Sequence, residues 1–115
     1  MTVTIYHNPN CSTSRNVLAL LRERGIEPVV VQYLKTPLDR GALKTLVATM
    51  GVPARDLVRW EEKEAVSAAG VTPEMTEGAL LEAMARFPVL MNRPIVATGK
   101  GARLCRPPET VSEIL

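Results

Sequence analysis

A single cysteine lies in a polar segment between a predicted strand and a predicted helix near the start of the chain. The segment reads Tyr6-His7-Asn8-Pro9-Asn10-Cys11-Ser12-Thr13-Ser14-Arg15-Asn16. A cysteine at such a junction lies beside unpaired backbone N–H groups and the positive end of the helix dipole, which favour the thiolate. His7 and Arg15 are close enough in sequence to add positive charge. The pattern predicts a nucleophilic thiolate that faces an anion.

The residues around Cys11 argue against two familiar cysteine chemistries. Ser14 occupies the place where a thioredoxin-type pair has its second cysteine, so an oxidised or adducted Cys11 needs a thiol from elsewhere. Arg15 follows too soon for a phosphatase-type loop, and we assign Asn8, Ser14 and Arg15 to a loop that supports the cysteine. The alternative is an ordinary buried cysteine. The polar, turn-forming neighbours argue against apolar surroundings.

Two arginines near the end of the chain stand directly before prolines. Arg93 precedes Pro94 and Arg106 precedes Pro107. Because a residue before proline is restricted to extended conformations, each arginine leaves the backbone in a limited range of directions, which lowers the cost of ordering it around an anion. The alternative for either one is a solvated surface arginine. Arg59 carries a weaker local signal, since it could equally be a helix end with arginine at the favourable end of the dipole.

The composition is that of one ordinary globular domain. The chain has 115 residues and a net charge of +2, which is too small to indicate a nucleic acid or an anionic membrane as partner. Ten arginines against four lysines favour oxyanion binding. One histidine and two distant cysteines do not make a metal site, and we expect no bound cofactor. With no targeting segment and no apolar run of about 20 residues, we expect a cytoplasmic protein.

The predicted elements alternate between strand and helix at both ends of the chain. A strand over residues 2–6, a helix over 12–24 closed by Gly25, and a buried parallel strand over 28–33 open the chain. The helices of the middle are predicted over residues 36–50, 53–59, 61–70 and 76–87, the first with Pro37 in its first turn and the last capped by Thr76. A hairpin of strands 94–98 and 102–105 follows, then a helix from about residue 109.

This order of elements is typical of a thioredoxin-like fold. We therefore predict an α/β protein with a mixed β-sheet flanked by helices, as one domain over residues 1–115 with a helical insertion at about 38–86. In such a fold the site lies at the carboxyl end of the first strand, which is where Cys11 stands.

Three motifs together resemble the glutaredoxin-coupled arsenate reductases over essentially the whole chain. They are residues 7–16, Met91-Asn92-Arg93-Pro94-Ile95-Val96 and Arg103-Leu104-Cys105-Arg106-Pro107. The resemblance implies a thioredoxin-like fold, a cis peptide before Pro94 and a role in arsenic detoxification. It also implies that Cys11 attacks arsenate, helped by His7, and that the oxyanion is bound by Arg59, Arg93 and Arg106. Glutathione then attacks the adduct as co-substrate and glutaredoxin releases arsenite; we expect a monomer.

Some residues depart from the family pattern, and two other functions stay open. Ser12 stands where many members have glycine, and Trp60-Glu61-Glu62 follows Arg59 where they have an uncharged or basic segment. One alternative is a regulator that binds RNA polymerase with this fold, although Ser14 removes the cysteine pair that such regulators often carry. The other is a reductase for a different substrate. We expect Cys105 to be a small half-buried strand residue rather than a second nucleophile.

Overall fold

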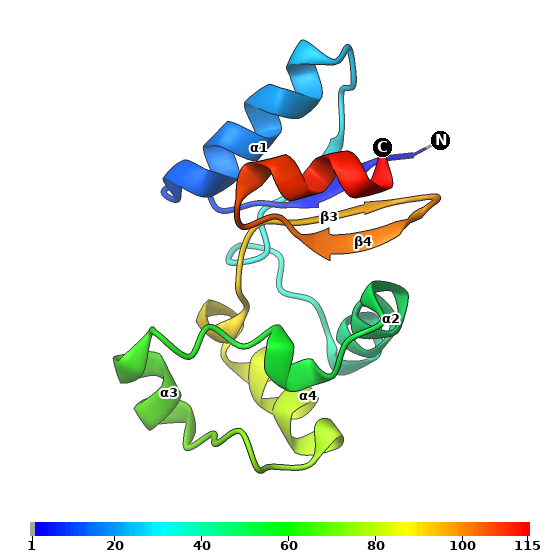
Figure 1. The fold of residues 1–115 in the computed structure, drawn as a ribbon. Helices are drawn as coiled ribbons and strands as arrows, with labels where there is room; N and C mark the ends of the chain where they lie inside the picture. The colour runs from blue at the N-terminus through cyan, green and yellow to red at the C-terminus, as the bar shows by residue number, and fades with distance from the viewer. Residues whose placement is uncertain (1) are drawn as a thin grey trace. The chain divides into compact units, whose positions relative to one another are not determined.

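The computed structural model describes residues 2–115, which form two compact units (Figure 1). The sheet unit runs up to Thr36 and resumes over Arg93–Leu115, and the helical unit is Pro37–Asn92. The sheet unit contains Cys11, Arg93 and Arg106, whereas Arg59 belongs to the helical unit.

The sheet has four short strands in the order β2-β1-β3-β4. They are β1 (Thr4–Tyr6), β2 (Val29–Val31), β3 (Ile95–Thr98) and β4 (Gly101–Leu104). Strand β1 is parallel to β2 and antiparallel to β3, and β3 and β4 form the predicted hairpin. This confirms the mixed sheet with helices that the sequence predicted.

Strand β2 is an edge strand, and the prediction that it is buried was wrong. Val29 is 54% exposed and Val30 is 37% exposed. The run of three valines resembled a central parallel strand, but β2 has β1 as its neighbour on one side and no neighbour within the sheet on the other. A β-branched run fits an edge strand as well as a central one, so composition alone does not distinguish them.

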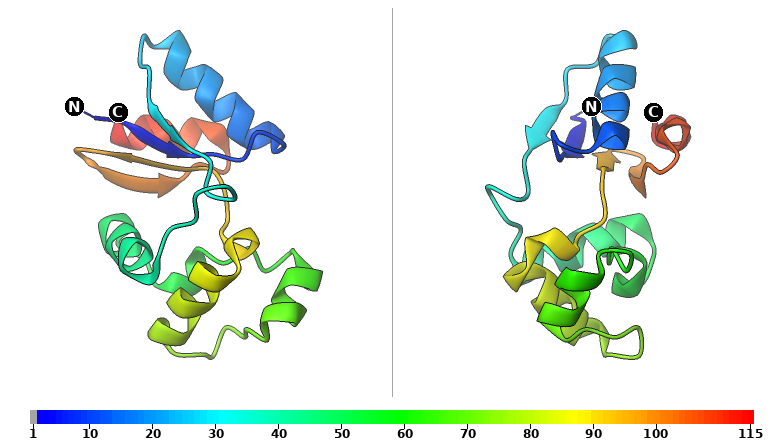
Figure 2. Two further views of the ribbon diagram at one scale, coloured as in Figure 1. Left: turned by 180° about the vertical axis from the view of Figure 1, so that it is seen from behind. Right: turned by 90° about the vertical axis from the view of Figure 1, so that its left-hand side faces the viewer.

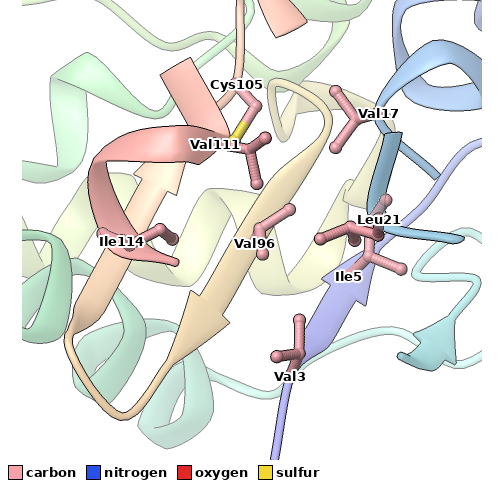
Figure 3. Close-up of a cluster of buried hydrophobic side chains, with 8 residues drawn as sticks. All are labelled: Val3, Ile5, Val17, Leu21, Val96, Cys105, Val111 and Ile114. Atoms are coloured by element: carbon pink, nitrogen blue, oxygen red, sulfur yellow. The ribbon is translucent and has the colours of Figure 1, made fainter. Parts of the chain in front are cut away.

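Helix α1 (Ser12–Glu23) and the 3₁₀-helix η3 (Pro108–Ile114) cover one face of the sheet (Figures 1 and 3). Helix α1 buries Val17 and Leu21, which lie four residues apart on one side of the helix. The core also includes Val3, Ile5, Val96, Cys105, Val111 and Ile114. This packing fixes the start of α1, and therefore Cys11, against the end of β1.

The helical unit is built around helix α4 (Glu77–Arg86), which packs against α2 (Arg40–Met50) and the short 3₁₀-helices η1 (Ala54–Asp56) and η2 (Pro88–Leu90) (Figure 2). The buried residues of α2 and α4 are Leu43, Leu46, Val47, Leu80, Leu81 and Met84. The remaining helix, α3 (Lys63–Ala69), has no buried residue, in agreement with the prediction that it faces solvent.

The sequence predicted the start of α4 correctly but placed the start of α2 too early. The Thr76 hydroxyl accepts a hydrogen bond from the Ala79 N–H at 3.2 Å, as predicted for the start of α4. The prediction that a helix begins at Thr36-Pro37 was wrong, because the Asp39 side chain accepts from the Ala42 N–H at 2.8 Å and α2 begins at Arg40. The helix predicted over residues 53–59 is the single turn η1, and the last predicted helix is of the 3₁₀ type.

Candidate active site

Cys11 is the residue immediately before helix α1 and closes the loop that follows β1. The Cys11 N–H donates to the Asn8 carbonyl at 3.0 Å, and the Asn10 N–H donates to the Asn8 side-chain oxygen at 3.0 Å. Cys11 itself has extended backbone angles, φ −101° and ψ 121°. The turn made by Asn8 therefore delivers the cysteine to the N-cap position, where helical N–H groups have no partner in the helix.

Two arginines of the sheet unit supply the positive charge at the cysteine. The Arg106 Nη1 lies 3.7 Å from the Cys11 Sγ, and the same nitrogen donates to the Arg93 carbonyl at 3.1 Å. The Arg93 carbonyl thus orients the guanidinium of Arg106 toward the sulfur. The peptide bonds before Pro94 and Pro107 are both cis, the first of them as predicted.

The pKa of Cys11 is lowered even though the residue is only 7% exposed. Burial acts to raise this pKa, but the Ser14 N–H, the charge of Arg93, the hydrogen bond from Arg106 and the Thr13 N–H together outweigh it. These groups favour the thiolate because each places positive charge or a donor at the sulfur. Cys11 is therefore buried, as the alternative interpretation held, but among donors and charges rather than apolar groups.

Thr13 is a contributor that the sequence analysis missed. Thr13 and Ser14 are the second and third residues of α1, the positions whose N–H groups an N-cap side chain normally accepts from. The Cys11 side chain forms no capping hydrogen bond of the usual kind, but both N–H groups act to lower its pKa. Counting helical positions from Cys11 would have identified both N–H groups from the sequence.

His7 does not add positive charge at neutral pH, which corrects the expectation from the sequence. Its pKa is lowered, first by burial and then by the charges of Arg22 and Arg15. The His7 Nδ1 lies 2.5 Å from the Ser14 hydroxyl oxygen, which also accepts from the Asn8 N–H at 3.1 Å. Since Ser14 is fully buried, its hydroxyl hydrogen needs an acceptor, and the neutral ring of His7 provides one. His7 thereby fixes Ser14 in place.

Arg15 holds the loop and is not among the groups that lower the pKa of Cys11. Its Nη1 donates to the Pro9 carbonyl at 2.9 Å. Arg15 and His7 also line a hollow of about 660 Å³ along α1, together with Pro9, Leu18, Ala19, Arg22 and Glu23. Cys11 does not line this hollow, so the chemistry is located by the thiol and its arginines rather than by this hollow.

Cys105 is a core residue. It is fully buried in the cluster of Figure 3, and its Sγ donates to the Arg103 carbonyl at 3.5 Å. Burial raises its pKa to about 12, with a further contribution from the charge of Glu113. Cys105 lies just after β4 and is more deeply buried than the half-buried strand residue that we expected. These surroundings favour the neutral thiol.

Arg59 lies in the helical unit, where its backbone and its side chain both have partners. Its N–H donates to the Leu90 carbonyl at 2.6 Å, and its Nη1 lies 3.3 Å from the Glu62 carboxylate. Val58, the residue before Arg59, forms an isolated antiparallel β-bridge with Met91. The predicted site residues His7, Asn8, Cys11, Ser14, Arg15, Arg93 and Arg106 thus share the sheet unit, whereas Arg59 is held within the helical unit.

Comparison with known proteins gives a consistent result. Residues 6–114 match the ArsC family. The chain is 47% identical to an arsenate reductase from Rhizobium meliloti (strain 1021) over all of this chain and 82% of that protein. It is 46% identical to the uncharacterized protein YfgD of Escherichia coli (strain K12), with 98% of this chain and 96% of that protein covered.

Solved structures show the same architecture. An arsenate reductase from Vibrio cholerae superposes with a TM-score of 0.93 at 43% identity, with 100% of this chain and 98% of that chain covered. The thioredoxin-like fold predicted from the order of elements is confirmed. No helix within residues 2–115 is long and apolar enough to cross a bilayer.

Proposed function

Because the chain belongs to the ArsC family, we propose that it reduces arsenate to arsenite, with Cys11 as the nucleophile and glutathione and glutaredoxin as the source of electrons. The observation that carries the proposal is the Arg106 guanidinium 3.7 Å from a cysteine thiol whose pKa is lowered. A thiolate beside fixed cations fits attack on an oxyanion better than it fits a structural role.

The first step is attack of the Cys11 thiolate on the arsenic of arsenate. A sulfur–arsenic bond forms, the bond from arsenic to one hydroxyl oxygen breaks, and that oxygen takes a proton from solvent and leaves as water. Arg93 and Arg106 make this approach of two anions possible because they neutralise the oxyanion and stabilise the charge that develops on its oxygens. We assign Arg59 to the oxyanion as well, on the resemblance alone.

Electrons come from thiols outside the chain. Cys105 is fully buried with a pKa raised to about 12, which leaves no evident second thiolate in this chain to resolve the adduct. In the proposed sequence the glutathione thiol attacks the arsenic and displaces a second oxygen as water, and the glutaredoxin thiol then takes the glutathione as a mixed disulfide. Two thiols are thereby oxidised to one disulfide and arsenic gains two electrons. Water then hydrolyses the remaining bond between Cys11 and arsenic(III), which releases arsenite and restores the Cys11 thiol. A glutathione-rich cytoplasm would supply this chemistry.

The test is a coupled assay with purified protein, in which arsenate-dependent NADPH oxidation is followed with glutathione, glutaredoxin and glutathione reductase. Turnover that needs both thiols supports the proposal. A second candidate is a glutathione-dependent reductase of the same mechanism for a different substrate, since Ser12 and Trp60-Glu61-Glu62 depart from the family pattern. Absence of arsenate turnover, with Cys11 still reactive toward an alkylating agent, would favour that candidate.

A further inference from the structure

One side of helix α1 carries a hollow of about 660 Å³ that takes no part in activating the cysteine. The residues of α1 that line it are spaced three and four apart, so they lie on one side of the helix, and they are Arg15, Leu18, Ala19, Arg22 and Glu23. The helix packs into the core through a different side, which carries Val17 and Leu21. A hollow of this volume lies in the range typical of small-molecule sites.

The hollow begins beside the loop that holds the cysteine. His7 and Pro9 of that loop form part of its wall, and the charges of Arg22 and Arg15 both lower the pKa of His7, so both guanidinium groups act on this wall. Arg15 follows Cys11 by four residues, which places it one helical turn further on, about 6 Å along the axis and on the same side of the helix. A molecule in the hollow therefore has one end about one helical turn from Cys11.

Two guanidinium groups and one carboxylate line the hollow. Arg15 uses its Nη1 to hold the Pro9 carbonyl. Arg22 uses its Nε and Nη2 to bind the carboxylate of Glu27, which does not line the hollow. A guanidinium has five N–H donors, so the hydrogen bonds within residues 2–115 leave donors on both arginines for a further anion. Glu23 supplies the single carboxylate of the lining.

We propose that this hollow binds glutathione, with Arg15 and Arg22 at its two carboxylates and Glu23 at its ammonium group. This inference rests on the proposed function, which names glutathione as co-substrate. The two carboxylates and one ammonium group of glutathione match the two guanidinium groups and one carboxylate of the hollow in number and in sign. The apolar side chains of Leu18 and Ala19 suit the methylene groups of the peptide. Glutathione held here lies close to the sulfur–arsenic adduct that its thiol attacks.

The experiment titrates the protein with S-methylglutathione, whose blocked thiol cannot react, and follows the backbone amides by NMR. The amide signals of Leu18 and Ala19 should shift on binding. Arg22→Gln should weaken the affinity about two- to fivefold, the range that corresponds to an exposed ion pair, whereas Arg24→Gln should leave it nearly unchanged. Arg24 is the matched control because it lies at the same end of α1, but its Nη2 donates to the Ser112 hydroxyl and it does not line the hollow.

The coupled assay provides a second readout. Arg22→Gln should raise the KM for glutathione by the same factor and leave the KM for arsenate unchanged. The rate of Cys11 alkylation should also stay the same in this variant, since Arg22 is not among the groups that act on the sulfur. These measurements separate a loss of glutathione binding from damage to the thiolate.

The absence of amide shifts along this side of α1 would overturn the inference, and so would an equal loss of affinity in Arg22→Gln and Arg24→Gln. Arsenate turnover with an unchanged KM for glutathione in Arg22→Gln would overturn it too, while the proposed function would stand. Failure of the proposed function looks different: arsenate turnover would be absent from the unaltered protein. The titration needs no arsenate, so it would still decide whether the hollow binds the peptide.

Discussion

Cys11 and Cys105 are both buried in the sheet unit, yet their surroundings prepare them for opposite chemistry. Cys11 is 7% exposed and Cys105 is fully buried. Burial acts to raise both pKa values, but donors and guanidinium charges reverse its effect at Cys11, whereas at Cys105 burial prevails and the pKa rises to about 12. The difference teaches that exposure does not identify a reactive cysteine; the donors and charges at its sulfur do.

The contrast is sharpest between Cys105 and the residue that follows it. Cys105 points into the core of Figure 3, while Arg106 extends to within 3.7 Å of the Cys11 sulfur. Consecutive residues thus serve the packing of the sheet unit and the chemistry of its site. Packing of Cys105 helps to fix the backbone from which Arg106 reaches Cys11.

The largest effect should separate the two cysteines directly. Cys11→Ser removes the nucleophile and should lower arsenate reduction by at least about 10³-fold, as loss of a catalytic nucleophile does in other enzymes. Cys105→Ala, which avoids burying a hydroxyl, should retain most of the activity. The coupled NADPH assay measures both. A Cys11–Cys105 disulfide found by mass spectrometry during turnover would contradict the assignment.

A second comparison concerns the arginines on either side of Cys105. Arg106→Ala should lower kcat/KM by roughly 10²-fold or more, because it removes a fixed charge from the developing oxyanion. Arg103→Ala is the matched control, since the Arg103 Nε pairs with Glu113 at 3.2 Å. This variant should have little effect. Similar small losses from both variants would mean that the charge of Arg106 does not act on the oxyanion.

The sequence predicted which residues of the sheet unit lie around Cys11, because their signals are local. A cysteine between a strand and a helix and two arginines before prolines are recognisable without coordinates, and the structure brings Cys11, Arg93 and Arg106 together. The same is true of the Thr76 cap and of the hairpin between β3 and β4.

What the sequence did not predict depends on distant neighbours. The charge of His7 is set by burial and by Arg22, which lies fifteen positions later in the last turn of α1. The exposure of β2 depends on the strand order, and valine-rich runs occur both at edges and in sheet centres. The start of α2 was missed for a different reason, because Pro37 and Asp39 are competing start signals and the side-chain cap decided between them.

The pH dependence of stability should carry opposite signatures of the two cysteines. Cys105 keeps its proton in the folded state up to about pH 12, whereas the unfolded thiol loses it near 9.0. The folded state therefore binds more protons above pH 9, and stability falls there as pH rises, by roughly 1.4 kcal/mol per pH unit. Urea unfolding at pH 8 and 10.5 should show a loss of about 2 kcal/mol that is absent in Cys105→Ala. An unchanged pH dependence in that variant would mean that Cys105 is not protected from ionisation.

The smallest expected effect concerns the source of positive charge at Cys11. Because the folded-state pKa of Cys11 lies below that of a free thiol, the rate of alkylation by iodoacetamide should titrate with a midpoint below that of the unfolded protein. Arg93→Ala should raise this midpoint, since the charge of Arg93 favours the thiolate. Arg15→Ala should leave it nearly unchanged, because Arg15 is engaged with the Pro9 carbonyl and is not among the groups that act on the sulfur. Ionisation of Cys11 stabilises the folded state at high pH. This contribution to stability is lost as the pH falls through the lowered pKa of Cys11, which is the reverse of the pH dependence expected from Cys105. Equal shifts from the two arginine variants would mean that long-range charge, rather than the placement of Arg93, sets the reactivity of Cys11.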